Sequence, residues 1–225
     1  ILDGNYYWFE NEPMVTIQGN PTERGNAIVK KNTDATANYN VSVKAQGTQD
    51  YPISMPTHIG MIPWYVNNDN FIIAYCDWRD NERPNGIREF QITGYINGTH
   101  VGFNDMWGDN ATYAALAKPT SYESTYAFNV RTIGKNLNID FLFNGEKLIS
   151  KGFNIEGVTG TATYGLYAFG NDTVNFTDLT YEAVEVQENV HTWNIFKPGA
   201  DAPTFTVNED KSVTLTSMNS HLSNL

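Results

Sequence analysis

The stretch Leu137-Asn-Ile-Asp-Phe-Leu-Phe-Asn-Gly145 alternates apolar and polar residues before it ends in an Asn-Gly pair. A period of two places Leu137, Ile139 and Phe141 on one face of a β-strand. Asn-Gly is a strong signal for a two-residue type I′ hairpin turn, because both central residues of that turn need positive φ. The stretch therefore predicts a half-buried strand that turns directly into an antiparallel neighbour.

Similar patterns extend outward from this hairpin in both directions. Apolar residues recur at every second position in four further segments: 39–45, 90–96, 126–130 and 164–169. Val174 and Phe176 also alternate, and we expect a bulge between them and the next apolar pair, Leu179 and Tyr181. Residues 71–76 are apolar throughout, which predicts a strand buried on both faces near the centre of a sheet. Asn97-Gly98 and the cluster Asn67–Asn70 mark further turns, and helical spacing appears only around Tyr113–Lys118. The sequence thus predicts an all-β fold, either a sandwich or a barrel.

Composition narrows the class of protein. The 225 residues carry 14 Lys+Arg against 25 Asp+Glu, a net charge of −11, while polarity comes mainly from 27 Asn and 23 Thr. The 30 aromatic residues argue against a disordered chain. Scarce basic residues argue against a nucleic-acid partner bound through its phosphates. No apolar run approaches the roughly 18 residues of a membrane span, so we expect no membrane insertion.

The single cysteine and the chain's first residue carry two further expectations. One cysteine excludes an intrachain disulfide and a Cys-based zinc site, and Cys76 lies in an apolar run that predicts a buried, inert thiol. Because the chain begins at Ile1 rather than Met, we expect a mature or excised fragment. An acidic, Asn/Thr-rich composition with few lysines suits a secreted or cell-surface bacterial protein.

A domain boundary is predicted near Glu182–Glu188, where the alternation ends and acidic residues concentrate. We expect one domain over 1–185, followed by a C-terminal segment over 186–225. Trp193 lies 20 residues before Val213, which belongs to the strand-like segment 212–216, as Trp8 lies 20 residues before Ile28, which belongs to the strand-like segment 26–30. The segment is therefore either the truncated start of a second copy of the module or a set of edge strands of the same sandwich.

Two stretches resemble a known family. The first is Gly60-Met-Ile-Pro-Trp-Tyr-Val-Asn-Asn-Asp-Asn-Phe-Ile-Ile-Ala-Tyr75, a strand, an Asn-rich tight turn and a second strand. The second is Tyr164-Gly-Leu-Tyr-Ala-Phe-Gly-Asn-Asp-Thr-Val-Asn-Phe-Thr-Asp-Leu179. Together they look like the concanavalin A-like jelly-roll domains of secreted carbohydrate-active enzymes, and in particular they are similar to the fructan-binding modules of bacterial levanases.

The resemblance covers roughly residues 26–183, and its motifs are mostly core and turn positions. It implies an antiparallel two-sheet β-sandwich, a jelly roll, with carbohydrate bound on the concave face or at loops along one edge. This chain departs from the commonest pattern by placing Pro63-Trp64 inside the first strand and by the long excursion Trp107–Glu123.

Candidate ligand-binding residues are aromatic, acidic and basic side chains that lie close together in the sequence. Sugar recognition combines flat aromatic faces with groups that bond paired hydroxyls, and three of the chain's five arginines, Arg79, Arg83 and Arg88, lie near Trp78. A loop around Trp107 offers a second aromatic residue with acidic neighbours. The predicted ligand-binding set is Asp77, Trp78, Arg79, Arg88, Glu89, Asp105 and Trp107. A competing interpretation of these residues is surface salt bridges around core tryptophans.

A structural calcium ion is a further candidate, because Asp and Asn oxygens suit this hard cation. The segments that offer such oxygens are Asn67–Asn70, Asp105–Asn110 and Asn171-Asp172. No EF-hand-like spacing occurs among them, and turn chemistry alone explains asparagine-rich turns. We therefore assign no metal ligand from the sequence.

Catalysis on the same fold would require particular spacings of acidic, tyrosine and histidine residues. A retaining glycosidase needs two carboxylates about 5–5.5 Å apart, and no E-x-D-x-x-E triad occurs. A polysaccharide lyase needs a Tyr/His pair, for which the candidates are His58, His100, Tyr65, Tyr75 and Tyr95. The spacing singles out no pair, so no catalytic residue is assigned.

The function that the sequence favours is non-catalytic carbohydrate binding, with fructan among the candidate ligands. The chain would serve as a module of a larger, multimodular glycan-processing protein that is secreted or held at the cell surface. Two alternatives remain open: a glycoside hydrolase or polysaccharide lyase on the same fold, and an adhesin domain whose partner is another protein.

Overall fold

The structure is a computed structural model, and it describes residues 14–18, 26–29, 36–47, 57–78, 87–103, 123–170, 173–185, 204–207 and 213–216. None of these residues lies in a helix, so none lies in a helix long and apolar enough to cross a membrane. The chain divides into two compact units, residues 1–185 and 186–225.

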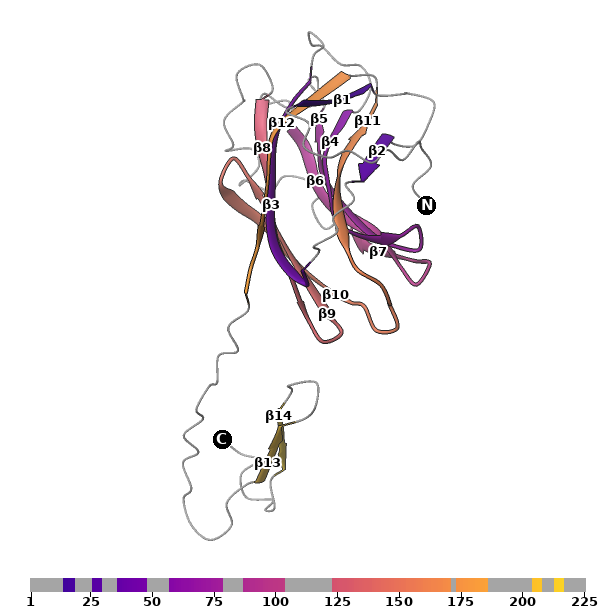
Figure 1. Ribbon diagram of the computed structural model, residues 1–225, viewed down its shortest axis with the longest axis vertical. Coiled ribbons are helices and arrows are strands. Elements are labelled where there is room, and N and C mark those ends of the chain that lie inside the picture. The colour runs from indigo at the N-terminus through magenta and orange to yellow at the C-terminus, as the bar shows by residue number, and fades with distance from the viewer. Residues whose placement is uncertain are drawn as a thin grey trace. The chain divides into compact units, whose positions relative to one another are not determined.

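Unit 1 contains two sheets of six strands each, and every strand pair in them is antiparallel (Figure 1). Sheet A has the order β1 (Met14–Gln18), β12 (Thr173–Ala183), β3 (Asn38–Gly47), β8 (Glu123–Ile133), β9 (Asn136–Phe143), β10 (Glu146–Asn154). Sheet B has the order β2 (Asn26–Val29), β11 (Thr163–Phe169), β4 (Thr57–Asn67), β5 (Asn70–Trp78), β6 (Ile87–Ile96), β7 (Thr99–Phe103). The predicted all-β fold is thus confirmed, as an antiparallel two-sheet sandwich.

The core lies between the two sheets and is filled by every second residue of each strand. In β3, the residues Tyr39, Val41, Val43 and Ala45 are buried, while the residues between them are partly buried or exposed. Aromatic side chains from both sheets meet there, as Phe90 of β6 does with Phe143 of β9 at a ring distance of 4.9 Å. The sandwich therefore gains its stability mainly from burying these alternating apolar residues.

The turns have the geometry that their sequences predict. Asn97 and Gly98 have φ of 51° and 71°, and Asn144 and Gly145 have φ of 51° and 86°. Both pairs occupy the left-handed region that a type I′ turn requires. These two hairpins join β6 to β7 and β9 to β10, which confirms the turns expected from the Asn-Gly pairs.

Two irregularities adapt strands to the sandwich. Proline cannot donate a ladder hydrogen bond, and Pro63 lies where the register of β4 against β5 shifts between Met61 and Trp64. In β12 the register shifts between Thr177 and Thr180, beside Asp178 with φ of 52°. The bulge expected between Phe176 and Leu179 is therefore confirmed.

In unit 2, β13 (Thr204–Val207) and β14 (Val213–Thr216) pair with each other in an antiparallel two-stranded sheet of their own. The strand-like segment expected around Val213 is present as β14. That residues 186–225 begin a second copy of the module stays a prediction.

Candidate functional site

The outer face of sheet B, the side turned away from the core, carries the candidate site. Alternation in β5 directs Ile72, Ala74 and Cys76 into the core between the sheets. The residues between them therefore point outward. On this outer face they form a second apolar cluster, here called the B-face cluster, which consists of Ile62, Phe71, Ile73, Tyr75 and Tyr167.

Strand register brings polar and aromatic residues of four strands into two adjacent rows on this face. In the first row, Phe169 of β11 pairs with His58 of β4, His58 with Asp77 of β5, and Asp77 with Glu89 of β6. In the second row, the partners in strand order are Tyr167, Gly60, Tyr75 and Gln91. Directly opposed residues on antiparallel strands have Cβ atoms about 4.5–5.5 Å apart, so residues distant in sequence meet here.

A short chain of hydrogen bonds links the two rows. The Tyr75 hydroxyl donates to Gln91 Oε1 at 2.5 Å, and Gln91 Nε2 donates to Glu89 Oε1 at 2.5 Å. All three side chains are buried, and Tyr75 is only 8% exposed. A buried polar group is costly unless it is hydrogen-bonded, and these contacts fix the orientation of the Glu89 carboxylate.

His58 provides the accessible edge of the site. Its ring stacks on Tyr75 at 4.3 Å with an interplanar angle of 15°, and it lies 4.9 Å from the ring of Phe169. Its Nε2 is 3.7 Å from Oδ2 of Asp77, whose side chain is 1% exposed, while the His58 side chain is 18% exposed. His58 thus presents an aromatic edge to solvent with a carboxylate behind it.

Burial sets the protonation of the two tyrosines. Desolvation, with smaller contributions from Tyr167, Glu89 and Asp77, holds the pKa of Tyr75 far above the usual value near 10. Desolvation and the nearby Asp77 likewise raise the pKa of Tyr167. Both phenols therefore remain protonated at neutral pH and act as hydrogen-bond donors, which makes Tyr75 poorly suited to serve as a general base.

The structure brings Asp77 and Glu89 of the predicted set together but removes Trp78 from the site. Trp78 is 0% exposed, its Nε1 donates to the Tyr126 hydroxyl of sheet A at 3.1 Å, and its ring packs near Phe143. The expectation that Trp78 stacks on a sugar is therefore corrected, because alternation along β5 turns it into the core. The competing interpretation of Trp78 as a core aromatic residue matches its position.

The remaining predicted residues cannot be placed in the site. Arg79, Asp105 and Trp107 lie outside the described residues, and so does the side chain of Arg88. Of the calcium candidates, Asp105–Asn110 and Asn171-Asp172 also lie outside them. No group of three or more His, Cys, Asp or Glu that could hold a metal ion occurs among the described residues.

The Asn67–Asn70 segment can be assessed, because it belongs to the part of the chain that the structure describes. The Asn67 side-chain oxygen accepts hydrogen bonds from the Asp69 amide and from Asn70 Nδ2, each at 3.0 Å. This is an Asx turn. Turn chemistry accounts for the Asn67 oxygen without a cation.

Several residues of the site are not singled out by the sequence. Gln91, Tyr167 and Phe169 are absent from the predicted set, and His58 and Tyr75 enter only as two of five candidates for a lyase pair. The residue pattern shows that each lies on a strand, and the Asn-rich turn predicts that β4 and β5 are neighbours. It does not show that β11 pairs with β4 or that β6 pairs with β5. The apolar run over 71–76 is the useful signal, because it predicts a strand whose outer face is also buried.

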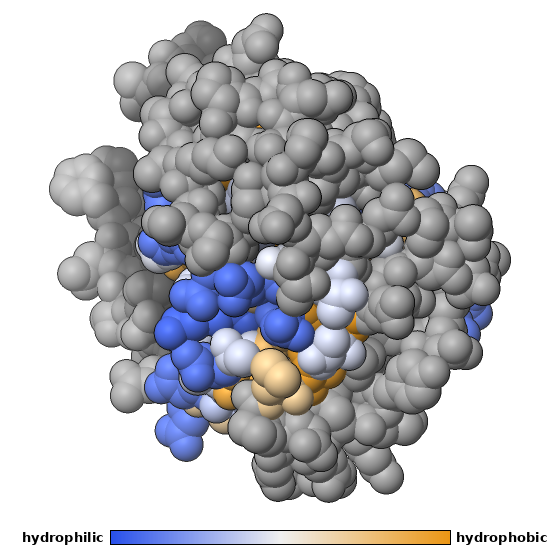
Figure 2. Space-filling model, turned by 90° about the horizontal axis from the view of Figure 1, so that it is seen from above, coloured by the Kyte–Doolittle hydropathy of each residue, from blue (hydrophilic) through white to orange (hydrophobic). Residues whose placement is uncertain are grey.

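The end of the molecule that is uppermost in Figure 1 shows hydrophilic and hydrophobic residues of the described part side by side (Figure 2). His58 is the second residue of β4, and its partner Asp77 is the second-last residue of β5. The first row of the site therefore lies near the ends of its strands.

Comparison with known proteins gives likenesses in structure only. No protein-family model matches the chain, and no curated protein matches it. Among solved structures, alginate lyase Aly36B aligns at a TM-score of 0.49 with 8% identity, over 78% of this chain and 82% of that chain.

Two other solved structures give similar values. A functionally unknown protein from Saccharomyces cerevisiae gives a TM-score of 0.48 with 12% identity, over 79% of this chain and 92% of that one. The VIP36 exoplasmic/lumenal domain, in a form bound to Ca²⁺ and Man3GlcNAc, gives 0.46 with 10% identity, over 79% and 86% of the two chains. With TM-scores below 0.5, these likenesses do not support a statement about what this chain binds, and no family is assigned to it.

Proposed function

We propose that this chain binds carbohydrate without cleaving it, through the outer face of sheet B around His58. The observation that carries the proposal is the row Phe169, His58, Asp77 and Glu89, in which two aromatic rings and two carboxylates lie side by side across four strands. Aromatic faces stack on the C–H faces of sugar rings, and carboxylates accept hydrogen bonds from paired hydroxyls.

Preorganisation of the row supports binding. Gln91 holds the Glu89 carboxylate, and the stacked Tyr75 ring holds the His58 imidazole. A ligand that reaches His58 meets groups whose side chains are already ordered, so little conformational entropy is lost on binding. The proposed entry point is the His58 edge, because Asp77 and Glu89 are almost fully buried behind it.

The proposed biological setting follows the sequence. The chain would be one module of a multimodular, secreted or cell-surface glycan-processing protein, with fructan among its ligands and residues 186–225 beginning a second copy of the module. Single modules of this kind bind weakly, and linked copies raise the overall affinity through effective concentration.

A second candidate function is glycan cleavage on the same face. It is favoured by one observation, the stacked His58–Tyr75 pair beside the opposed Asp77 and Glu89. The raised pKa of Tyr75 counts against it, because a lyase would need a group that removes a proton near neutral pH. Release of product from any polysaccharide would show that the chain cleaves glycans and would replace the proposal of binding without cleavage.

The test is affinity electrophoresis of the 225-residue chain in gels that contain levan, inulin, laminarin, xylan or alginate. We expect retardation in at least one gel, and a loss of affinity of about tenfold in His58→Ala. His100→Ala is the matched control, since His100 lies on β7 at the other end of the same face, where it contacts Tyr95. Equal retardation of His58→Ala and the unaltered chain would overturn the assignment of the site.

The same incubations would be assayed for new reducing ends and for unsaturated uronate absorbance. Absence of both, together with retardation, is the expected result. If no glycan retards the chain and a protein partner does, the adhesin alternative replaces this proposal.

A further inference from the structure

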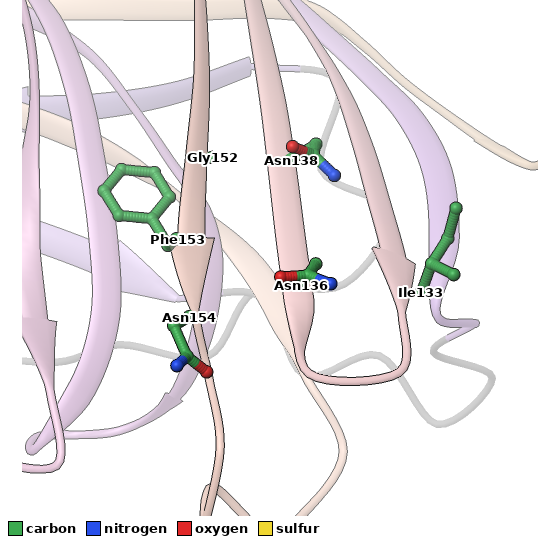
Figure 3. Close-up of a pocket in the computed structure, with 6 residues that line it drawn as sticks. All are labelled: Ile133, Asn136, Asn138, Gly152, Phe153 and Asn154. Atoms are coloured by element: carbon green, nitrogen blue, oxygen red, sulfur yellow. The ribbon is translucent and has the colours of Figure 1, made fainter. Parts of the chain in front are cut away.

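The outer face of sheet A has a hollow of about 430 Å³ near the ends of β8, β9 and β10. Its six lining residues are Ile133, Asn136, Asn138, Gly152, Phe153 and Asn154. Figure 3 shows the three asparagine side chains on the neighbouring strands β9 and β10, with Ile133 at the end of β8. Asn136, Asn138, Gly152 and Asn154 are all exposed, so the hollow is an open depression of the surface rather than an enclosed cavity.

Strand register builds this hollow from three strands. Asn136 pairs with Asn154 of β10 and with Ile133 of β8, and Asn138 pairs with Gly152. A Cβ atom at Gly152 would lie 3.0 Å from Oδ1 of Asn138. Gly152 therefore leaves open the space that a side chain would fill.

The hydrogen-bonding groups of the hollow are both donors and acceptors. Within the described residues, the Asn136 and Asn138 side chains form no hydrogen bond with another protein group. Asn154 uses its Oδ1 to accept the Glu156 amide at 3.0 Å and keeps its NH₂ group available. Each carboxamide offers one acceptor oxygen and two N–H donors, a combination that matches hydroxyl groups, which also donate and accept.

The hollow is electrically neutral in a chain of net charge −11. None of its lining residues is charged. The nearby charged groups have partners in the protein: Glu156 lies 3.6 Å from Lys135, and Asp140 lies 3.7 Å from Lys147. The guanidinium of Arg131, which lies opposite Asn138, donates to the Asn40 side chain and to two backbone carbonyls. Ile133 adds an apolar side chain that is 48% exposed. Amides beside one exposed apolar group suit a ligand with hydroxyls on its edge and C–H groups on its face.

We propose that this hollow is a second saccharide site, selective for neutral oligosaccharides. It lies on the outer face of sheet A, on the other side of the core from His58, and it shares no residue with the site on sheet B. The second site goes beyond the proposed function and does not rest on it, because each face can bind or fail to bind by itself. Two such sites would let one chain hold two glycan segments at once.

The test is an NMR titration of the ¹⁵N-labelled 225-residue chain. The neutral probes are nystose, laminaritetraose, cellotetraose and maltotetraose, and the anionic probe is tetragalacturonate. We expect a neutral probe to shift the backbone amides of Asn136, Asn138, Gly152 and Asn154 in a saturable way, with tetragalacturonate at least tenfold weaker.

Variants identify the groups responsible. Asn138→Ala removes one carboxamide and Gly152→Val fills the space beside it, and each should weaken the neutral probe at these amides by about tenfold. Asn129→Ala is the matched control, because Asn129 is on the outer face of β8 opposite Asp140 and does not line the hollow. It should bind within twofold of the unaltered chain. Melting temperatures confirm folding, and Asn136→Ala replaces any variant that does not fold.

Three results would overturn the second site: no shift at these amides with any neutral probe, equal binding of tetragalacturonate, or unaltered binding in both Asn138→Ala and Gly152→Val. His58→Ala separates the two proposals. If it leaves the shifts at Asn138 intact and glycan gels retard it as strongly as the unaltered chain, the site on sheet B fails and the second site stands. If Gly152→Val loses the shifts at Asn138, the result bears only on the second site and says nothing against the site on sheet B.

Discussion

The outer faces of the two sheets share the same pleat but have opposite character. On sheet A, Asn40 and Ser42 are partly exposed and Lys44 is exposed, and the Ser42 and Thr180 hydroxyls form a hydrogen bond at 2.7 Å. On sheet B, the equivalent outward positions of β5 hold Phe71, Ile73 and other residues below 10% exposure. The outward positions of β3 are thus in contact with solvent, whereas those of β5 are buried like core positions and include the polar residues Tyr75 and Asp77.

The largest expected effect tests whether the outer face of sheet B is a true interior. Phe71→Ala removes a ring that is 1% exposed in the B-face cluster, and we expect the free energy of unfolding to fall by about 3–5 kcal/mol, as for a core phenylalanine. Chemical denaturation measures it. Ser42→Ala on sheet A is the control and should change the free energy of unfolding by less than about 0.5 kcal/mol. Similar values for the two variants would abolish the contrast between the faces.

An intermediate effect concerns the buried hydrogen bonds. Gln91→Leu keeps the volume but removes the acceptor of the Tyr75 hydroxyl and the donor to Glu89. Groups left buried without these partners should cost about 1–3 kcal/mol of stability. On sheet A, Ser150→Ala removes a hydrogen bond of 2.6 Å to Asp140 at an exposed position and should cost less than about 0.5 kcal/mol. A cost for Gln91→Leu no larger than for Ser150→Ala would show that water solvates both networks.

The smallest expected effect appears only at alkaline pH. Burial raises the pKa of Tyr167 above the value near 10 of an unfolded tyrosine. The folded state then keeps a proton that the unfolded state releases, so stability is complete below pH 10 and falls as pH rises beyond it. For one such tyrosine the slope is up to about 1.4 kcal/mol per pH unit. Between pH 8 and about pH 11, the free energy of unfolding should fall less steeply with pH in Tyr167→Phe than in the unaltered chain. An equal slope in the two proteins would contradict the burial of this phenol.

Alternation and turn chemistry make most of the sandwich predictable. Tyr39, Val41 and Val43 alternate in the sequence and are buried in the structure, and Asn144-Gly145 turns where positive φ is needed. The apolar run over 71–76 correctly indicates a strand with both faces buried. Strand alternation and turn type depend on residues that are adjacent in the sequence, so a short segment is enough to predict them.

The candidate site is predictable only in part, because it depends on strand order. Asp77 and Glu89 belong to one cluster in the sequence, yet they meet because β5 and β6 pair in one particular register. The sequence cluster also includes Trp78, which follows Asp77 directly, and in a strand the next residue always faces the other way. The Asn-rich turn predicts that β4 and β5 are neighbours, but His58 lies opposite Asp77 only because the register shifts twice along this pair, between Met61 and Trp64 and between Tyr65 and Asn67.

The order of strands in Figure 1 also bears on how the chain folds as it is made. Strands β11 and β12 are the last of unit 1, yet β11 lies between β2 and β4, and β12 lies between β1 and β3. During synthesis, the first third of the chain therefore waits for residues 163–183 before either sheet is complete, and such non-local pairing is slow. Until then β3 and β4 each keep an open edge, which exposes a nascent chain to edge-to-edge aggregation.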